Sequence, residues 1–556
     1  MPYGDSRNAG FSGPQRYLKA SWVGPLHNGN TTDSLGIAPQ EERHIEPLAL
    51  GLIPLDDRPC NRIFPAQLAE AAGHRLEMPP GELLGWFTDP GNCEEVGRWL
   101  CACPAQRLIV SIDMLCYGGL IASRAPAVRL EVALDRLETL RRLRSERPEA
   151  TIFAFSVLPR LGTTVAAAHE LQRHADLVSY SQLVDRVERL GEDSARGDLE
   201  DLLARLDPEA LASYVAVRRR NHAISKAAIR LVADEVVDYL VLAQEDAAAV
   251  GLHVPEQLAL RAQCEEFRVT ERVAIQSGAD EVAMVLIARH AIGAAGRSPE
   301  VAVEYGTDAG AEIIPKYEDR PLRDTVECQL RAAGARLAVP GQADAMLFVH
   351  TPLVTQREAA EAPPLGQAPG LALQAERVVD GLRAASEVGL PVGLVDAAYC
   401  NGADGELIDA LRRSGGARHL SAFAAWNTTA NSVGTAVSQL CLTALARSQQ
   451  SACDDAFRRF TGCRLVDDYG YQSVVRPSAM ELARSQEADP FALGDDWPEF
   501  ERQVSSELEP LAHSLYSELL AAPDDPPAEL RVSLPWRRLF EVEIELLSSL
   551  ETKNRQ

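Results

Sequence analysis

The sequence predicts an α/β fold built on parallel strands. First, short apolar runs alternate with segments whose apolar residues recur at helical spacing, such as 128–144 and 278–296. Second, the runs are continuous, which is typical of strands buried on both faces of a sheet. Third, the 556 residues, 46% hydrophobic and 24% charged, suffice for a large globular core or for several domains.

Nine apolar runs are candidate strands. They are 48–53, 107–112, 151–157, 238–243, 272–276, 300–305, 345–350, 391–396 and 420–425. Nine strands permit two architectures. We expect a TIM-barrel-like parallel sheet with one extra strand. The alternative is two tandem doubly wound α/β domains that divide near 262–278.

The composition divides the chain into three parts. Residues 1–45 are rich in Gly, Ser, Asn and Pro without a signal-like apolar segment, so we expect a flexible leader. Residues 46–440 form the expected α/β catalytic domain. Residues 441–556 contain helical segments and Pro-rich punctuation, which predict a mostly helical C-terminal appendage whose last strand or helix packs back on the core. The Pro/Gly-rich stretch 358–370 predicts an exposed loop.

The net charge and the cysteines indicate which class of ligand and which compartment to expect. A net charge of -25 argues against nucleic-acid backbones and anionic membranes, and it favours a neutral or cationic small ligand. The chain has no apolar run of the roughly 18 residues that a membrane span needs. Most of the eleven cysteines lie in apolar segments, as in reduced cytoplasmic proteins. We expect a cytoplasmic protein with a small-molecule substrate, and the oligomeric state stays open.

Polar residues follow most of the apolar runs. Ligands of both architectures bind at the carboxyl ends of parallel strands, so we expect these residues to share one site. The candidate substrate-binding residues are Asp56, Asp57, Arg58, Asn61, Asp113, Tyr117, Arg124, Arg160, Asp396, Tyr399, Asn401, Asp404, Trp426, Asn427 and Asn431. Helix capping is the alternative role for single residues such as Asp280 and Asn431.

The segment PLDDRPCN (54–61) is the first of these strand ends. Pro54 and Pro59 restrict the backbone on either side of the charges. We expect Arg58 to neutralise one of Asp56 and Asp57, which leaves the other aspartate to face a ligand.

The residue types favour a polyhydroxyl ligand. The sequence has no phosphate-binding glycine loop after a strand and no GxSxG nucleophile elbow. Its histidines are scattered, and His350 is expected to be a hydrogen-bonded strand-end residue. Carboxylates and amides bind vicinal hydroxyls, aromatic rings stack on sugars, and paired carboxylates supply acid and base. We expect no cofactor.

Glu245 and Asp246 are the candidate acid–base pair. Two adjacent carboxylates with little solvent cannot both ionise easily, so one pKa rises and that group can act as an acid. The alternative is that the two side chains point to opposite faces and that one forms a salt bridge with an arginine such as Arg160 or Arg124.

Six segments occur in a characteristic order. They are IPLDDRPCN (53–61), SIDMLCYGGLIASR (111–124), LAQEDAAAVG (242–251), SGADEVAMVLIAR (277–289), DAAYCNGADGEL (396–407) and AAWNTTANSVGTAVSQ (424–439). They resemble the signatures of DUF4127, a bacterial family of unassigned function. The resemblance extends from about 46 to 546 and includes SLPWRRLFEVEI (533–544). It implies no activity, and the family usually has Asp where this chain has Glu245.

The order of strand ends is also similar to that of glycoside hydrolase family 84, whose members are TIM barrels with a carboxylate pair after the fourth strand. Here Glu245 and Asp246 follow the fourth run, and 396–404 and 426–431 occupy the later positions. The resemblance implies that Glu245 orients a substrate acetamido group for attack on the anomeric carbon. It implies that Asp246 protonates the leaving oxygen. The ninth run has no counterpart in that barrel.

These observations lead to three hypotheses of function. The first is a glycosidase-like hydrolase that cleaves a small glycoside with paired carboxylates. The second is a lyase, isomerase or hydrolase of a small polar metabolite, assisted by Mg²⁺ or Mn²⁺ among Asp56, Asp57, Asp113 and Glu245. The third is a sugar or metabolite sensor without catalysis.

Overall fold

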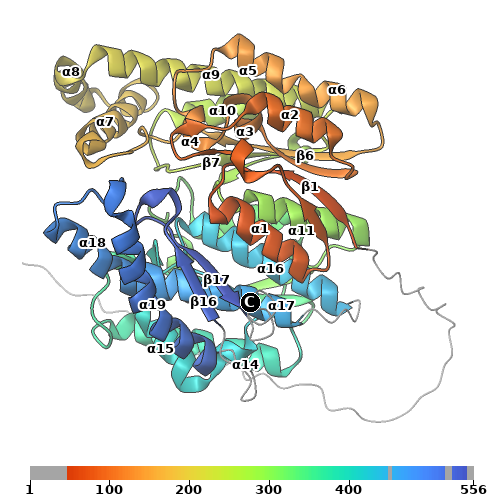
Figure 1. The fold of residues 1–556 in the computed structure, drawn as a ribbon, viewed down its shortest axis with the longest axis vertical. Coiled ribbons are helices and arrows are strands. Elements are labelled where there is room, and N and C mark those ends of the chain that lie inside the picture. The colour runs from red at the N-terminus through yellow and green to blue at the C-terminus, as the bar shows by residue number, and fades with distance from the viewer. Residues whose placement is uncertain (1–46, 449–453, 520–528, 548–556) are drawn as a thin grey trace, which may run out of the picture. The chain divides into compact units, whose positions relative to one another are not determined.

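The computed structural model describes residues 47–448, 454–519 and 529–547. Parallel sheets alternate with helices along the chain, so the expected α/β class is confirmed (Figure 1). The leader expected at 1–45 lies outside the described residues. None of the helices in the described ranges combines the length and the apolar character needed to cross a membrane.

The first sheet has six parallel strands. In spatial order they are β2 (Arg75–Glu77), β1 (Ala49–Ile53), β5 (Arg107–Ser111), β6 (Thr151–Leu158), β7 (Tyr239–Gln244) and β8 (Val273–Ser277). Five of them coincide with the first five apolar runs. β2 was not expected, because an edge strand of three residues carries no apolar run.

The second sheet has five parallel strands. In spatial order they are β10 (Arg336–Ala338), β9 (Glu300–Tyr305), β11 (Ala345–His350), β13 (Val392–Asp396) and β15 (Ala422–Ala424). Four of them coincide with the last four apolar runs. The short, largely exposed edge strand β10 is again the one that the sequence did not predict.

The strand pairing gives two open sheets among the described strands. In each sheet the first strand of the chain pairs on one side with the second and on the other with the third, which is the order of doubly wound sheets. Among the described strands, no pairing joins the two sheets or closes either one. This is the alternative arrangement of two tandem sheets. β8, the last strand of the first sheet, ends at Ser277, and β9, the first strand of the second sheet, begins at Glu300.

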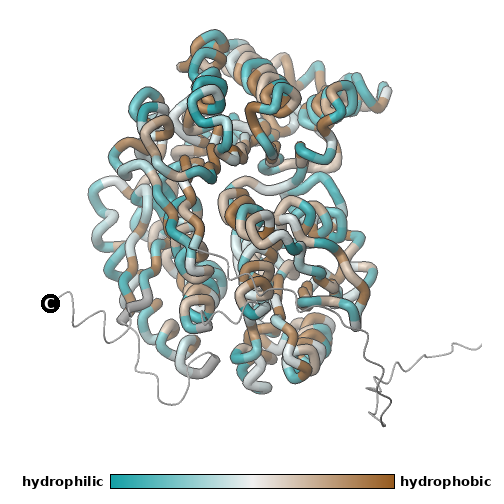
Figure 2. Tube along the Cα trace, turned by 90° about the vertical axis from the view of Figure 1, so that its right-hand side faces the viewer, coloured by the Kyte–Doolittle hydropathy of each residue, from teal (hydrophilic) through white to brown (hydrophobic). Residues whose placement is uncertain are grey.

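Helices connect the strands of both sheets. Up to the change of sheet they are α1 (Pro59–Ala71), α2 (Cys93–Ala102), α3 (Ile112–Tyr117), α4 (Leu120–Ser123), α5 (Leu130–Leu137), α6 (Thr139–Glu146), α7 (Leu171–Glu188), α8 (Arg196–Arg205), α9 (Pro208–Ala233), α10 (His253–Glu266) and α11 (Val282–Ala295). The second sheet adds α12 (Asp308–Ala311), α13 (Leu322–Ala333), α14 (Pro369–Glu387), α15 (Gly405–Ser414) and α16 (Thr429–Ser448). Hydrophilic residues recur along the outer helices (Figure 2).

The central strands bury both faces, which explains their continuous apolar runs. On β6, Phe153 and Phe155 belong to a core that includes strands of the second sheet. Ile152 and Ala154 belong to a separate core that the helices of the opposite face cover. The period of two along the strand therefore places alternate residues in two different cores.

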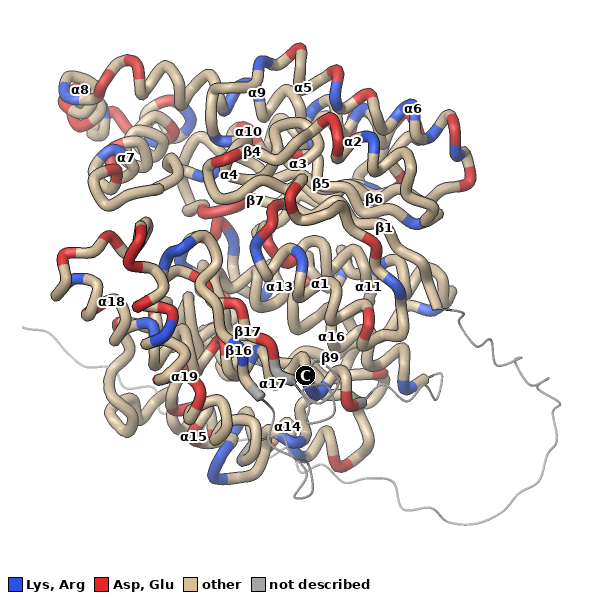
Figure 3. The backbone as a smooth tube through the Cα atoms, viewed as in Figure 1, with Lys and Arg blue, Asp and Glu red and all other residues tan. Residues whose placement is uncertain are grey.

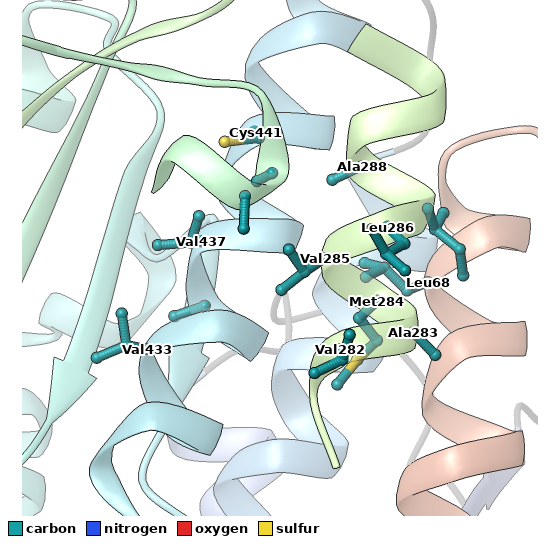
Figure 4. Close-up of a cluster of buried hydrophobic side chains, with 14 of the residues drawn as sticks. Leu68, Val282, Ala283, Met284, Val285, Leu286, Ala288, Val433, Val437 and Cys441 are labelled. Carbon is teal, nitrogen blue, oxygen red and sulfur yellow. The ribbon is translucent and has the colours of Figure 1, made fainter. Parts of the chain in front are cut away.

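Helix α11 lies in the core that both sheets share. Its sequence VAMVLIARHAIGAA is apolar nearly all round, as expected for a helix without a solvent face. Figure 4 shows Leu286 turned toward Leu68 of α1 and Val285 turned toward α16. This packing holds the segments before α11 and α16 close to each other, and both segments carry strand-end residues of the site.

The C-terminal part combines helices with a strand pair. It contains α17 (Asp454–Leu465), a π-helix (Val466–Val475), α18 (Arg476–Ser485), α19 (Trp497–Leu519), and the antiparallel strands β16 (Glu529–Ser533) and β17 (Glu543–Leu547). The strand pair packs against α19 and α17. α16 continues through residue 440, where the sequence placed the start of the appendage.

Candidate functional site

The candidate site lies where strands of both sheets end. In the first sheet, segments 54–61, 245–246 and 278–281 follow β1, β7 and β8, and in the second sheet 426–431 follows β15. Hydrogen bonds connect the first of these segments with the third, and the third with the fourth. Figure 3 shows acidic and basic segments near the label of β7. The location agrees with the rule that ligands bind at the carboxyl ends of parallel strands.

Arg58 joins two carboxylates from different strands. Its Nε and Nη2 donate to Asp56 Oδ2 at 3.0 and 2.7 Å, and its Nη2 and Nη1 donate to Asp280 at 2.7 and 3.2 Å. Asn61 Nδ2 donates to Asp56 at 2.8 Å and to Asp280 at 3.2 Å. All four residues are buried. Burial raises the pKa of Asp280, although Arg58 opposes this effect.

Two asparagines connect Asp280 with the second sheet. Asn427 Nδ2 donates to Asp280 Oδ2 at 3.2 Å, and the backbone N–H of Asp280 donates to Asn431 Oδ1 at 3.1 Å. Asp280 and Asn431 are therefore more than local helix caps. We define the strand-end cluster as Asp56, Arg58, Asn61, Asp280, Asn427 and Asn431.

Asp57 contacts the C-terminal segment. Trp536 Nε1 donates to Asp57 Oδ1 at 2.7 Å, and the indole lies 5.1 Å from the guanidinium carbon of Arg58. Burial raises the pKa of Asp57 to about 6, although the Trp536 hydrogen bond lowers it. Arg58 thus pairs with Asp56, and the expected ligand-facing aspartate has a partner within the chain.

Glu245 and Asp246 converge on neighbouring arginines. Arg124 donates to Glu245, and Arg160 donates to Asp246. Arg160 Nη1 also lies 3.9 Å from Glu245 Oε1, so one guanidinium approaches both carboxylates. Both side chains approach Arg160, and the arginine partners that the alternative interpretation named, Arg124 and Arg160, are both present. Asp246 adopts a positive φ of 32°, which is uncommon outside glycine.

The two carboxylates have opposite pKa shifts. Burial disfavours the ionised form of both groups. For Glu245, Arg124 and Arg160 outweigh burial, and its pKa is lowered. For Asp246, burial together with the negative charge of Glu245 outweighs Arg160, and its pKa is raised. The arrangement favours one ionised and one protonated carboxyl group.

A cavity of about 240 Å³ lies beside this pair. Four arginines line it, together with hydroxyl, amide and apolar side chains, and we call it the arginine cavity: its arginines are Arg124, Arg160, Arg173 and Arg218. Since Arg124 and Arg160 also bind the two carboxylates, they stand between the pair and the cavity.

Asp113 and Tyr117 are buried beside this region. Asp113 Oδ2 accepts a 2.8 Å hydrogen bond from the backbone N–H of Val157, and burial raises its pKa to about 6. Tyr117 is packed in the core of the first sheet, with the guanidinium carbon of Arg220 4.4 Å from its ring centroid. Asp113 adds negative potential near Arg124, whereas Tyr117 has a packing role.

Asp396 and Asp404 form a separate group with His350 in the second sheet. His350 Nε2 lies 2.9 Å from Asp404 Oδ2, and the backbone N–H of Asp404 donates to Asp396 Oδ2 at 2.6 Å. Asp404 also caps α15 through the N–H of Glu406. Burial raises the pKa of Asp396 to about 6, although His350 opposes this effect. His350 is thus hydrogen-bonded at a strand end, as expected.

Asn401 connects the loop after β13 to the strand-end cluster. Its N–H donates to the carbonyl oxygen of Asn427 at 2.8 Å, and its Nδ2 donates to Glu358 Oε2 at 2.7 Å. Asn401 and Asn427 both have positive φ values, 57° and 52°. Glu358 begins the stretch that the sequence assigned to an exposed loop, and it also accepts a 2.6 Å hydrogen bond from Tyr317.

The aromatic candidates are packed rather than free. Trp426 is buried, lies edge-on to Phe64 at 5.7 Å, and donates from Nε1 to Thr435. Tyr399 is buried in a small apolar cluster on β14 (Tyr399–Cys400), which pairs with β12 (Arg357–Glu358). Neither ring offers the stacking face that the sequence suggested for a sugar.

Comparison with known proteins gives one match. The model of a family described as a protein of unknown function (DUF4127) matches residues 50–545. The chain belongs to this family. Neither the curated proteins nor the solved structures gave a match.

In this DUF4127 protein, four polar participants of the site were not among the predicted site residues. Asp280 was named only as a possible helix cap, although it binds Arg58, Asn61 and Asn427. Trp536 lies in the segment SLPWRRLFEVEI, which was noted for its resemblance but not placed at the site. Arg173 lies on α7 and Arg218 on α9, so neither follows a strand. Their only local signal is a positive charge on a helix of an acidic protein.

The acidic residues of this DUF4127 protein are mostly engaged with donors of the chain. Asp56 binds Arg58, Asp57 binds Trp536, Asp113 binds the Val157 N–H, and Glu245 binds Arg124. Across the described ranges, no three His, Cys, Asp or Glu side chains are grouped as ligands for one metal ion. The four carboxylates of the Mg²⁺ or Mn²⁺ hypothesis are therefore spread over different partners.

Proposed function

We propose that this protein is a hydrolase that cleaves a small glycoside and that Glu245 and Asp246 are its catalytic residues. One observation carries the proposal: the two adjacent carboxyl groups share Arg160 and have pKa values shifted in opposite directions. Pairs of titratable groups whose pKa values are driven apart are typical of acid–base sites.

The opposite shifts assign the roles. Asp246 keeps its proton to higher pH and donates it to the leaving glycosidic oxygen. Glu245 stays ionised and stabilises the positive charge that develops at the anomeric carbon, or orients a substrate group that attacks this carbon. The same division of roles follows from the similarity to glycoside hydrolase family 84. Arg160 must release Asp246 before the proton is transferred, because both bind each other in the free protein.

A sensor without catalysis is the second candidate. The observation that favours it is that both carboxylates already have arginine partners. A purely structural pair of this kind needs no substrate, since arginine and carboxylate satisfy each other.

Hydrolysis of aryl glycosides separates the two candidates. The purified protein is assayed with 2,4-dinitrophenyl and phenyl glycosides of several sugars. We expect Asp246→Asn to lower kcat/KM by at least about 100-fold on phenyl glycosides, because general acid catalysis contributes that much. The loss should be smaller on dinitrophenyl glycosides, whose leaving group needs little protonation. Asp193→Asn, which changes an exposed aspartate paired with Arg196, is the control.

Two results would contradict the proposal. One is an Asp246→Asn variant that retains full activity on every glycoside the wild type cleaves. The other is a wild-type protein that binds sugars without cleaving any member of the panel, which is the behaviour of a sensor.

A further inference from the structure

The arginine cavity has a charge opposite to that of the chain. The chain has 80 acidic and 55 basic residues, yet the described residues that line the cavity include four arginines and no Asp or Glu. The arginines come from separate elements: Arg124 follows α4, Arg160 follows β6, and Arg173 and Arg218 lie on α7 and α9. Four independent elements thus bring guanidinium groups to one small space.

Carboxylates outside the lining hold these arginines. Each guanidinium has at least one such partner: the pairs are Arg124–Glu245, Arg160–Asp246, Arg173–Glu170 and Arg218–Glu256, and Arg160 also approaches Glu245. A guanidinium has five N–H donors, so a pair that uses one or two leaves others for a ligand. The carboxylates therefore orient the arginines without occupying the cavity.

The four arginines differ in how many donors they keep. Arg218 is buried, and it donates through Nε and Nη2 to Glu256 and through Nη1 to the carbonyl oxygen of Arg160. Its role is therefore to link the elements that line the cavity. Arg173 has a side chain that is 48% exposed and pairs with Glu170 through Nη2. Arg160 Nη1 lies beyond hydrogen-bond distance of Glu245, at 3.9 Å. Arg124 donates through Nη1 to Thr164 and through Nη2 to Glu245. The Nε of Arg160 is buried without a hydrogen-bond partner, so we assign the ligand to Arg160 and Arg173.

The remaining lining limits the size and the character of the ligand. Thr163, Ser213 and Asn221 add hydroxyl and amide groups, while Leu177 and Val217 add apolar surface. The volume of about 240 Å³ is below the roughly 300–1,000 Å³ of sites for drug-sized ligands. A group about as large as a monosaccharide matches this space.

We infer that the substrate carries an anionic group, a carboxylate or a phosphate on a monosaccharide-sized unit, which Arg160 and Arg173 bind in the arginine cavity. This inference rests on the proposed hydrolase function, because it names the substrate class of that site. The net charge of the chain favoured a neutral or cationic ligand. The guanidinium donors that line the cavity act at contact distance, whereas salt screens the distant charges of the chain beyond about 8–10 Å.

Binding of an anion to Arg160 also favours the protonated form of Asp246, which is the proton donor. Arg160 lowers the pKa of Asp246 in the free protein. When the anion takes the donors of Arg160, Asp246 loses this positive partner and its pKa rises further. Substrate binding thus frees the carboxyl group that donates the proton and increases the fraction that is protonated.

Binding of simple anions tests the inference apart from catalysis. Isothermal titration calorimetry compares D-glucuronate, inorganic phosphate and D-glucose at constant ionic strength. We expect at least one anion to bind while glucose does not, and Arg173→Gln to weaken that binding by roughly tenfold, since one charged hydrogen bond contributes about 1.5 kcal/mol. Arg196→Gln on α8, which breaks a similar exposed pair with Asp193, should leave the affinity unchanged.

The pattern of binding identifies the anion. Glucuronate binding alone assigns a uronic acid, and phosphate binding alone assigns a phosphorylated sugar. The inference is overturned if the wild type binds neither anion, if glucose binds as well as glucuronate, or if Arg173→Gln and Arg196→Gln bind alike.

Hydrolysis distinguishes failure of the inference from failure of the proposed function. Nitrophenyl glucuronides and nitrophenyl 6-phosphoglycosides are compared with their neutral counterparts. Cleavage of neutral glycosides at equal or higher kcat/KM keeps the hydrolase and overturns the anionic substrate. Anion binding that depends on Arg173 without cleavage of any glycoside overturns the hydrolase and leaves anion recognition standing.

Discussion

The indole Nε1 of Trp536 donates a 2.7 Å hydrogen bond to Oδ1 of Asp57, across 479 positions of the chain. Trp536 lies between β16 and β17 and has a positive φ of 55°. A nonglycine residue in this conformation is held by its surroundings, since the left-handed region is unfavourable by roughly 1–2 kcal/mol. The segment between β16 and β17 thereby supplies a hydrogen-bond donor to the loop that follows β1.

Trp536→Phe tests this contact. Removing the indole N–H leaves Asp57 without the donor that lowers its pKa, so this pKa rises above about 6. Asp57 is ionised at pH 8 and largely protonated at pH 5. We therefore expect a loss of about 1–3 kcal/mol in unfolding free energy at pH 8 and a smaller loss at pH 5. Urea unfolding at both pH values measures the difference.

The control for this experiment is Trp99→Phe on α2. It removes an indole N–H that is not placed at the site, so its effect should be independent of pH. Equal losses at pH 5 and pH 8 for Trp536→Phe would contradict the role given to the hydrogen bond.

Arg58→Lys tests whether the strand-end cluster needs the planar guanidinium of Arg58, which donates to two carboxylates at once. Lysine keeps the charge but cannot donate in parallel to Asp56 and Asp280, which Arg58 does through three nitrogens. We expect the unfolding free energy to fall by about 2–4 kcal/mol, because buried carboxylates lose charged hydrogen bonds. Arg98→Lys, in an exposed pair with Glu95, should change it by less than about 0.5 kcal/mol. A similar small loss for Arg58→Lys would show that the cluster tolerates a point charge.

The sequence predicted local features well and nonlocal ones poorly. All nine apolar runs are strands, because burial on both faces leaves a continuous apolar signature. The choice between a barrel and two tandem sheets could not be made from the sequence, because it depends on which strands pair and the runs themselves do not record this. The edge strands β2 and β10 were missed because short, partly exposed strands lack the signature.

The same limit applies to the site. The motif containing Asp56 and Arg58 was found, since its charges follow a strand within one short segment. Asp280 lies 222 positions from Arg58, and Trp536 lies 479 positions from Asp57. The arginine cavity was missed because Arg173 and Arg218 lie on helices that no strand-end rule singles out.

Substitutions of Asn427 test the backbone conformation where the segments of the two sheets meet. It has a φ of 52° and donates to Asp280, so its substitution has two separable effects. Asn427→Gly removes the hydrogen bond, fits the positive φ and makes the unfolded chain more flexible, whereas Asn427→Ala removes the hydrogen bond and adds strain at positive φ. We expect Asn427→Ala to be less stable than Asn427→Gly by about 1 kcal/mol in urea unfolding. Equal stabilities would mean that the backbone relaxes out of the left-handed region.

The raised pKa of the buried Glu281 leads us to expect that the free energy of unfolding depends on pH. It is fully buried, accepts hydrogen bonds from Gln329 Nε2 at 2.6 Å and from the Ala279 N–H at 2.8 Å, and burial raises its pKa to about 8. In the unfolded chain Glu ionises near pH 4.3. Between about pH 5 and pH 8 the folded state therefore binds more protons than the unfolded state, and the contribution of Glu281 to stability falls as the pH rises.

Glu281→Gln removes this titration and keeps the shape of a protonated carboxyl group. We expect the variant to gain stability relative to the wild type as the pH increases from 5 to 8, by on the order of a few kcal/mol. Chemical unfolding at several pH values measures the difference. Glu265→Gln on α10, an exposed glutamate, is the control and should give a difference that does not change with pH. A Glu281→Gln difference that is equally flat would mean that Glu281 is ionised in the folded protein, with Gln329 and the Ala279 N–H sufficient to stabilise its charge.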